Sequence, residues 1–365
     1  MRKWFTTFAA FLSSLLAVCA FLIFAIVLGS LTGCTPVSES RIEESPELSD
    51  AITSSSIGSE HIPTSSDSLW LPVRKSPVAV GAHDFYAIRT DGTLIMWGYH
   101  DDGPIIEEIS FQDAIEIKDH SVAVYASSRN VTLVVDEDGS LWSINTARFD
   151  GLVDNIDVDM ENEPMKPAKV MDNVSMAAVG QFHSLILKRD GSLWVQGFGR
   201  FGAAWLDKQE SYFVKVMDNV VWTDITTYGG YAVTANHELW SWGLSDNGEQ
   251  PEKLLDEAIQ VSSSNLVLTE KGELISCNYD YETNTFTPPK SLLTNTVQCS
   301  GGLGIKEDGT LWVCSTENPS PQKVGENVLY AAQGEQIILT LHKDGSLWLI
   351  DVSSDSGLCQ ETQLS

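Results

Sequence analysis

The fold of this chain is decided by three adjoining stretches: Ala177-Ala178-Val179-Gly180, His183-Ser184-Leu185-Ile186-Leu187-Lys188 and Asp190-Gly191-Ser192-Leu193-Trp194. The first two are short, mainly apolar runs, which are typical of buried strands. Asp-Gly supplies the residue of positive φ that a tight hairpin turn needs. The sequence therefore predicts two strands, a tight turn and a third strand that begins with Leu-Trp.

This pattern returns along the chain. The Leu that follows the turn occurs seven times, at positions 94, 141, 193, 239, 274, 311 and 347, in steps of 47, 52, 46, 35, 37 and 36 residues. Periods of this size indicate a repeat architecture. Two copies are weaker: Lys271-Gly272-Glu273-Leu274, and Asn236-His237-Glu238-Leu239, in which His237 stands where Gly is expected.

Each unit is predicted to contain four short strands, A to D in chain order. Strand D follows a Pro-x-Lys-Val-like pattern, as in Pro167–Val170 and Pro321–Val324. In strand C, Leu and Trp are adjacent in five units, so both faces of that strand are apolar; these Trp residues are Trp142, Trp194, Trp240, Trp312 and Trp348. A sheet covered on both faces fits a propeller, in which each blade lies between two others. The Trp set could also form a ligand-stacking cage, but its repetition at one position favours packing.

These units resemble the repeats of the regulator of chromosome condensation family, which are seven-bladed β-propellers. The matching columns are Gly180–Leu185, the Asp-Gly-x-Leu-Trp turns, and Trp-Gly at Trp97 and Trp242. The resemblance covers Leu69 to Ile350 and implies an all-β, seven-bladed β-propeller of four-stranded antiparallel blades. The position of His183 is Asp84 in unit 1, so the family's functional residues do not carry over. The nucleotide exchange on a small GTPase known in the eukaryotic branch is not expected here.

The propeller is predicted to span residues 69–350 and to close through an N-terminal strand. Leu69–Lys75 has the character of a strand D, which unit 7 lacks, because residues 351–365 form a polar tail without Pro-x-Lys-Val. Leu71–Arg74 should then pair with strand C of unit 7 and cover two exposed edges.

Residues 1–33 are predicted to be a lipoprotein signal peptide. Arg2 and Lys3 precede an uncharged apolar run, and Leu31-Thr32-Gly33-Cys34 resembles the lipobox of bacterial lipoproteins, which implies lipidation of Cys34. The alternative is an uncleaved transmembrane helix, since the run exceeds the roughly 20 residues that span a bilayer. Either way the body of the chain is expected at the outer face of a bacterial cytoplasmic membrane.

The composition of the chain predicts a disordered tether and a folded core, and it excludes one class of partner. Residues 34–68, rich in Ser, Glu and Pro, are predicted to be the lipidated Cys34 and a disordered tether. The chain carries a net charge of -28, so binding to nucleic acid is not expected. Hydrophobic residues make up 43% of the chain, which is enough for a folded core.

Motifs for catalysis, metals and cofactors are missing from the sequence. It contains no Gly-x-Ser-x-Gly, phosphate loop, His-Glu-x-x-His or Cys-x-x-Cys. The acidic run Asp157–Glu163 has Asn162 where a calcium loop needs Gly. We expect no enzyme activity, no cofactor and no metal, and we expect His183 to bond backbone inside its own blade.

Four cysteines remain after Cys19 and Cys34: Cys277, Cys299, Cys314 and Cys359. An oxidising compartment would permit disulfides. Cys299 and Cys314 are expected on strands A and C of one blade, about 9–10 Å apart, which is beyond disulfide reach. Free buried thiols are favoured, and disulfide pairing stays open.

Candidate binding residues gather in the A–B and C–D connections. Because consecutive strands are antiparallel, these connections emerge on one face, while B–C turns and D–A connectors emerge on the other. Exposed aromatic residues with Arg are typical of protein interfaces. The candidates are His83, Tyr99, His100, Arg129, Phe198, Arg200, Phe201, Trp205 and Tyr228. Anchoring of the loops against the blade tops is the alternative.

The sequence is compatible with three functions. The favoured one is a membrane-anchored, non-enzymatic module that binds a protein or cell-wall component. The second is an inhibitor of a secreted enzyme, because the propeller-type β-lactamase inhibitor proteins are similar in repeat pattern and location. The third is a hydrolase or lyase of the kind that other propellers host. The oligomeric state stays open.

Overall fold

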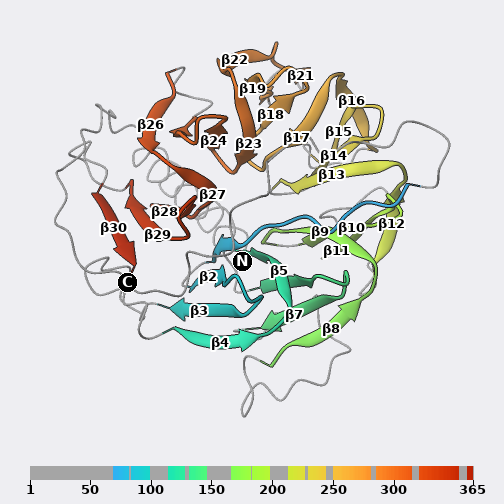
Figure 1. Cartoon of the computed structure of the whole chain (residues 1–365). Helices are drawn as coiled ribbons and strands as arrows, with labels where there is room; N and C mark the ends of the chain where they lie inside the picture. The colour runs from blue at the N-terminus through green and yellow to red at the C-terminus, as the bar shows by residue number, and fades with distance from the viewer. Residues whose placement is uncertain are drawn as a thin grey trace, which may run out of the picture.

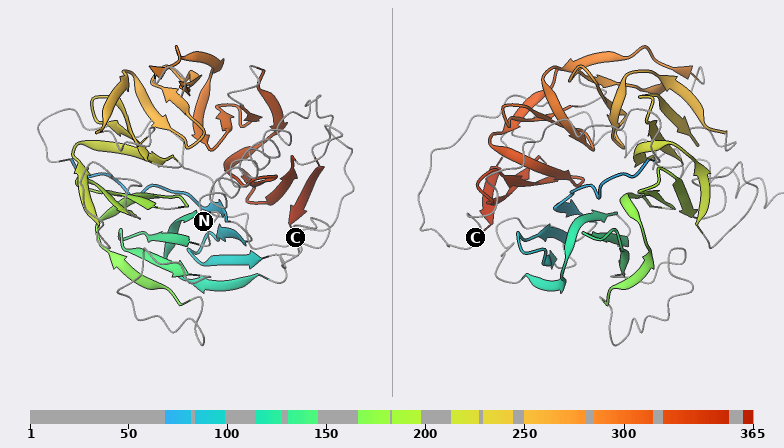
Figure 2. Two further views of the ribbon diagram at one scale, coloured as in Figure 1. Left: turned by 180° about the vertical axis from the view of Figure 1, so that it is seen from behind. Right: turned by 45° about the vertical axis from the view of Figure 1, so that its right-hand side comes forward.

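The computed structural model describes residues 69–81, 84–98, 114–127, 131–145, 166–181, 183–197, 213–226, 229–243, 250–280, 285–314, 320–352 and 360–364. Within them the chain forms seven antiparallel four-stranded sheets, arranged around a common centre as the blades of a propeller (Figure 1). The views in Figure 2 show the same ring from behind and obliquely. The predicted fold class is confirmed.

Blades 1 to 4 follow one another in chain order. Blade 1 contains β1 (Val78–Val80), β2 (Asp84–Ile88), β3 (Leu94–Gly98) and β4 (Ile115–Lys118). Blade 2 contains β5 (Ser121–Ala126), β6 (Val131–Asp136), β7 (Leu141–Asn145) and β8 (Ala168–Met171). Blade 3 contains β9 (Val174–Val179), β10 (His183–Lys188), β11 (Leu193–Gly197) and β12 (Val214–Met217). Blade 4 contains β13 (Val220–Ile225), β14 (Gly230–Thr234), β15 (Leu239–Trp242) and β16 (Glu252–Leu255).

Blades 5 to 7 complete the ring. Blade 5 contains β17 (Ala258–Val261), β18 (Leu266–Thr269), β19 (Leu274–Ser276) and β22 (Lys290–Leu293), with a small hairpin, β20 (Tyr279–Asp280) and β21 (Thr285–Phe286), inserted before the outer strand. Blade 6 contains β23 (Thr296–Ser300), β24 (Leu303–Lys306), β25 (Leu311–Val313) and β26 (Gln322–Gly325). Blade 7 contains β27 (Val328–Gln333), β28 (Ile337–His342), β29 (Leu347–Asp351) and β30 (Gln360–Leu364).

The core lies between the blades. Apolar clusters join each pair of neighbours, and one of them combines Val78 and Phe85 of blade 1 with Leu339 and Leu349 of blade 7. The repeated Leu of strand C is inaccessible in the first six blades and 8% exposed at Leu347. Blades that bury both faces explain why strand C is apolar at consecutive positions.

The repeated Trp of strand C packs, as predicted, and also makes a polar contact. In blade 3, Asp190 Oδ1 accepts hydrogen bonds from Ser192 N (2.9 Å) and Ser192 Oγ (2.5 Å), and Trp194 Nε1 donates to Ser192 Oγ (2.8 Å). The same arrangement recurs in blades 6 and 7, at Asp308, Thr310 and Trp312 and at Asp344, Ser346 and Trp348. The motif therefore specifies a hydrogen-bonded turn as well as a hairpin.

The predicted closure by an N-terminal strand is wrong. The outer strand of blade 7 is β30, which pairs with β29 from Leu347↔Leu364 to Asp351↔Gln360. Residues 351–365, expected to be only a polar tail, thus supply a strand whose sequence lacks the Pro-x-Lys-Val signal. All four strands of blade 7 come from the end of the chain, and the ring closes by the packing of blade 7 on blade 1.

The segment Leu69–Ser76 instead runs over blade 3 toward the centre of the ring (the blue ribbon in Figure 1). Leu71 N donates to Arg189 O at 2.6 Å and Arg74 N donates to Ser175 O at 2.8 Å, both in blade 3. The segment does bond and pack against the ring, as its apolar residues suggest, but not against blade 7.

The described residues include no helix long and apolar enough to cross a membrane. The predicted signal peptide, Cys34 and the tether lie outside them.

Candidate binding face

The two faces of the ring are built differently. One face carries the seven B–C turns and the six D–A connectors, which we name the turn belt. Thirteen of its residues have a left-handed backbone: Gly92, His120, Gly139, Asn173, Gly191, Asn219, His237, Glu257, Gly272, Asn295, Gly309, Asn327 and Gly345. The Asp-Gly and Asp-Asn-Val elements of the sequence therefore fold into one repeated structure.

Backbone hydrogen bonds join this belt from blade to blade. Gly139 O, in the turn of blade 2, accepts from Val174 N at the start of blade 3, at 2.9 Å. In the same connector, Asn173 O accepts from Arg189 N in the turn of blade 3, at 2.8 Å. Equivalent bonds from the first residue of strand A to the preceding turn are made by Ser121, Val220, Ala258, Thr296 and Val328. The belt is a repetitive structural element.

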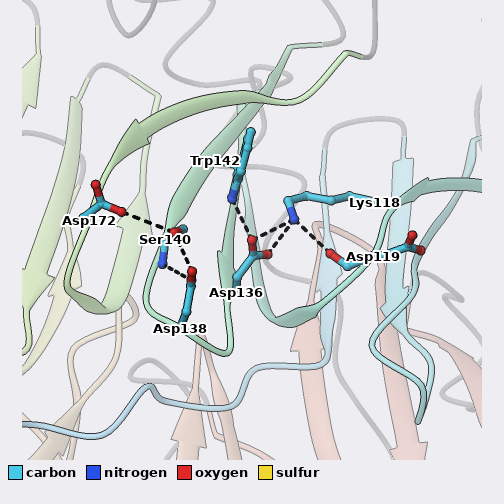
Figure 3. Close-up of polar contacts among 7 residues, drawn as sticks. All are labelled: Lys118, Asp119, Asp136, Asp138, Ser140, Trp142 and Asp172. Carbon is cyan, nitrogen blue, oxygen red and sulfur yellow. Dashed lines mark hydrogen bonds and ion pairs between the residues drawn. The ribbon is translucent and has the colours of Figure 1, made fainter.

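The joint between blades 1 and 2 adds a nearly buried ion pair (Figure 3). Lys118 Nζ lies 2.7 Å from Asp136 Oδ1, and their side chains are only 12% and 11% exposed. Trp142 Nε1 donates to Asp136 Oδ2 at 2.7 Å, and Lys118 Nζ lies 4.7 Å from the centre of the Trp142 ring. Each charge has a partner here, so the cluster serves as a structural joint.

The opposite face, which carries the A–B and C–D connections, we name the variable face. All nine predicted binding residues belong to these connections and lie outside the described residues: His83, Tyr99, His100, Arg129, Phe198, Arg200, Phe201, Trp205 and Tyr228. Their clustering stays a prediction. The strand ends that flank them in sequence lie on the variable face, because each blade is an antiparallel A-B-C-D sheet.

Contacts between blades hold the described strand ends of the variable face together. The prediction that the His183 side chain bonds backbone inside its own blade is wrong, because its Nε2 lies 2.7 Å from Gly229 O in blade 4. Trp222 Nε1 donates to Val261 O at 3.0 Å, and the Tyr231 hydroxyl donates to Asn265 Oδ1 at 2.7 Å, both from blade 4 to blade 5. These bonds make a fixed base for the connections.

Two ionisable groups in this base have shifted pKa values. Burial lowers the pKa of His183 from 6.5 to about 4, so the imidazole is neutral near pH 7. Burial raises the pKa of Asp224 to about 6, although its carboxylate accepts hydrogen bonds from Ile225 N (2.7 Å) and Ser263 N (2.9 Å). Both groups join adjacent backbone segments.

Asp224 and its neighbour Trp222 were not among the residues predicted from the sequence. The signal was available, because Trp222-Thr223-Asp224 interrupts the small apolar residues that strand A carries elsewhere, as in Ala177-Ala178-Val179. A large or charged side chain in an otherwise apolar column marks a specific contact, here to blade 5.

Of the cysteines, Cys277, Cys299 and Cys314 are buried and free, as favoured, and Cys359 lies outside the described residues. Burial raises the pKa of Cys277 to about 11 and that of Cys314 to about 12, so both thiols stay protonated and unreactive. No group of three or more potential metal-ligating side chains occurs within the described parts of the chain. The acidic run Asp157–Glu163 falls outside them.

Comparison with known proteins gives one sequence relative. No protein-family model matches the chain. The chain is 22% identical over 199 residues to the Ultraviolet-B receptor UVR8 of Arabidopsis thaliana, a match that covers 48% of this chain and 43% of the receptor. The matched part of the chain therefore spans less than half the length of this curated relative.

Solved structures give matches of low identity. Prp20p from Saccharomyces cerevisiae is 16% identical with a TM-score of 0.43, and the match covers 79% of this chain and 76% of that chain. Human WBSCR16 is 17% identical with a TM-score of 0.46, covering 81% and 83%. With the seven described blades, the sequence match supports a propeller resembling those of the regulator of chromosome condensation family.

Proposed function

We propose that this chain is a membrane-anchored, non-enzymatic propeller that binds another protein, or a cell-wall component, through its variable face. The observation that carries the proposal is the difference between the two faces. The turn belt repeats one backbone structure at every blade, whereas the connections of the variable face differ in length and composition from blade to blade. Variable loops on a rigid scaffold are a common basis of recognition.

The proposed location is the outer face of a bacterial cytoplasmic membrane, with lipid on Cys34. This location is supported by the positive charges of Arg2 and Lys3, by the uncharged apolar run that follows them, and by the motif Leu31-Thr32-Gly33-Cys34. In that location a small GTPase is not an expected partner, and the net charge of -28 disfavours nucleic acid. Growth with a radiolabelled fatty acid tests the anchor: label should appear in the wild-type chain and vanish in Cys34→Ser. Label that persists in the variant would overturn lipidation at this residue.

Affinity capture from the secreted and surface proteins of the organism that produces the chain tests the binding role. Chains comprising residues 69–365 should retain one or a few defined proteins at stoichiometric amounts. A secreted hydrolase that loses activity when captured would identify the second candidate, an enzyme inhibitor. Turnover of a glycan or peptide substrate by the purified chain would overturn the non-enzymatic proposal.

A further inference from the structure

The segment Leu69–Ser76 contacts the ring as an extended peptide would. It belongs to none of the seven four-stranded sheets, which are complete without it. Its backbone nevertheless bonds to two successive blades. In addition to the bonds of Leu71 and Arg74 to blade 3, Ser76 N donates to Val122 O (3.3 Å) and Ser76 O accepts from Val124 N (2.9 Å) in blade 2.

Side chains of the ring add two bonds to the backbone of the segment. Arg189 Nε donates to Leu71 O at 2.9 Å, and Ser175 Oγ donates to Pro72 O at 2.6 Å. The segment thus forms an isolated parallel bridge with the inner strand of blade 2, at Ser76 and Ala123, and bonds to the inner strand and the B–C turn of blade 3. Backbone bonds to an exposed strand edge are also how extended peptides bind to sheets.

Alternate side chains of the segment enter the ring. Leu71 is 3% exposed within the apolar cluster of blades 3 and 4, and Leu69 packs against the same cluster. Val73 packs against the cluster of blades 2 and 3. This two-residue period is that of a bound β-strand, whose backbone gives affinity and whose alternate side chains give specificity.

Arg74 supplies the most selective contact. Its guanidinium carbon lies 5.3 Å from the centre of the Trp222 ring in blade 4, a cation–π distance. Burial raises the pKa of the Tyr125 phenol on blade 2, and the nearby positive charge of Arg74 lowers it. Arg74 therefore enters a polar site formed by the inner strands of blades 2 and 4.

We propose that this strip of the ring, defined by Val122, Val124, Ser175, Arg189 and Trp222, is a binding site for an extended peptide with an apolar residue three positions before an arginine. Leu69–Ser76 is its resident occupant, and a peptide of the same pattern from another protein competes with it. The site uses different residues from those predicted for the variable face, so it does not depend on the proposed function.

The test supplies the resident sequence in trans. A fluorescent synthetic peptide of residues 69–76 is titrated against the full chain and against the full-length double variant L71A/R74A, whose own segment is weakened. Fluorescence anisotropy should show saturable binding to the variant and at least tenfold weaker binding to the wild-type chain. A peptide with Arg74→Glu is the matched control and should not bind. Equal binding to both chains, equal binding of the control peptide, or no binding to a folded variant would overturn the proposal.

A second measurement needs no variant. Native-state hydrogen exchange of the wild-type chain should show the amides of Arg74 and Val124 exchanging at least tenfold faster than that of Leu185 in the interior of blade 3, through an opening insensitive to denaturant. If both amides exchange only with global unfolding, the segment is a fixed part of the fold and not a displaceable occupant.

Discussion

At the scale of single residues, two features define the repeat: the tight turn, and the hydroxyl in that turn that accepts a hydrogen bond from the Trp indole of strand C. Blade 4 departs from the pattern. His237 takes a left-handed backbone with φ of 62°. Glu238 stands where blades 3, 6 and 7 have the Ser or Thr that accepts the indole hydrogen bond. Trp240 Nε1 is buried and has no hydrogen-bond partner among the described residues. The sequence identified this copy as weak, and the structure shows the physical reason.

The double change His237→Gly with Glu238→Ser should therefore stabilise the propeller. Glycine removes the strain of a left-handed residue, and Ser supplies the missing acceptor, for a combined gain of about 1–2 kcal/mol. The contacts of His237 with Glu270 and of Glu238 with Lys253 are lost, but both are partly exposed and contribute little. Chemical denaturation measures the gain. The reciprocal control, Gly309→His with Thr310→Glu in blade 6, removes the acceptor of the Trp312 indole and should destabilise the propeller. A stabilised control would contradict this explanation.

The shifted pKa of His183 gives a prediction about pH. The folded-state pKa of about 4 lies below the ordinary 6.5, so the unfolded chain binds a proton more readily. The stability that neutral His183 contributes is complete above pH 6.5 and is lost as the pH falls toward 4, by about 3 kcal/mol. Asp224 acts in the opposite sense, because its raised pKa favours folding as the pH falls below about 6.

Comparison of wild type with His183→Gln isolates the first effect. The free energy of unfolding of wild type relative to the variant should decrease steadily between pH 6.5 and 4. A difference that is constant over this range would mean that His183 is not neutral in the folded chain.

At the scale of strands, the hairpins were predictable and the closure was not. Strands A, B and C carry side-chain signals, namely apolar runs, Asp-Gly and Leu-Trp. The outer strand is held by backbone bonds at the rim, so β30 needs little more than an extended chain beside β29. Leu69–Lys75 looks like the missing strand because Leu69, Leu71 and Val73 do pack into the core, although against blades 2, 3 and 4. Trp70 stays exposed.

Removal of β30 should test this closure. A chain that ends at Val352 leaves the edge of β29 unpaired. The midpoint temperature of thermal unfolding should therefore fall, on the order of 5 °C or more, and self-association should increase. Differential scanning calorimetry and light scattering measure both. The matched control removes residues 1–68 and should unfold like the full chain; an unchanged midpoint without β30 would exclude it from the closure.

At the scale of the whole molecule, the sequence predicted the ring and its two kinds of face, because both follow from a repeat of antiparallel strands. It did not place the contacts between blades, such as His183 with Gly229, since they join residues of different repeats. The predicted binding residues all lie in connections outside the described residues, so their assignment follows from the sequence.

Partner capture by face-specific variants tests the central claim, that the variable face binds and the turn belt supports it. One variant carries Phe198→Ala, Phe201→Ala and Tyr228→Ala. Its control carries Lys169→Ala, Lys215→Ala and Lys323→Ala, three exposed lysines whose ion pairs, to Asp172, Asp218 and Glu326, lie beside the belt. The aromatic variant should lose the captured partner while its thermal unfolding stays nearly unchanged, and the lysine variant should retain it. Full capture by the aromatic variant, its failure to fold, or equal loss in the lysine variant would contradict the account.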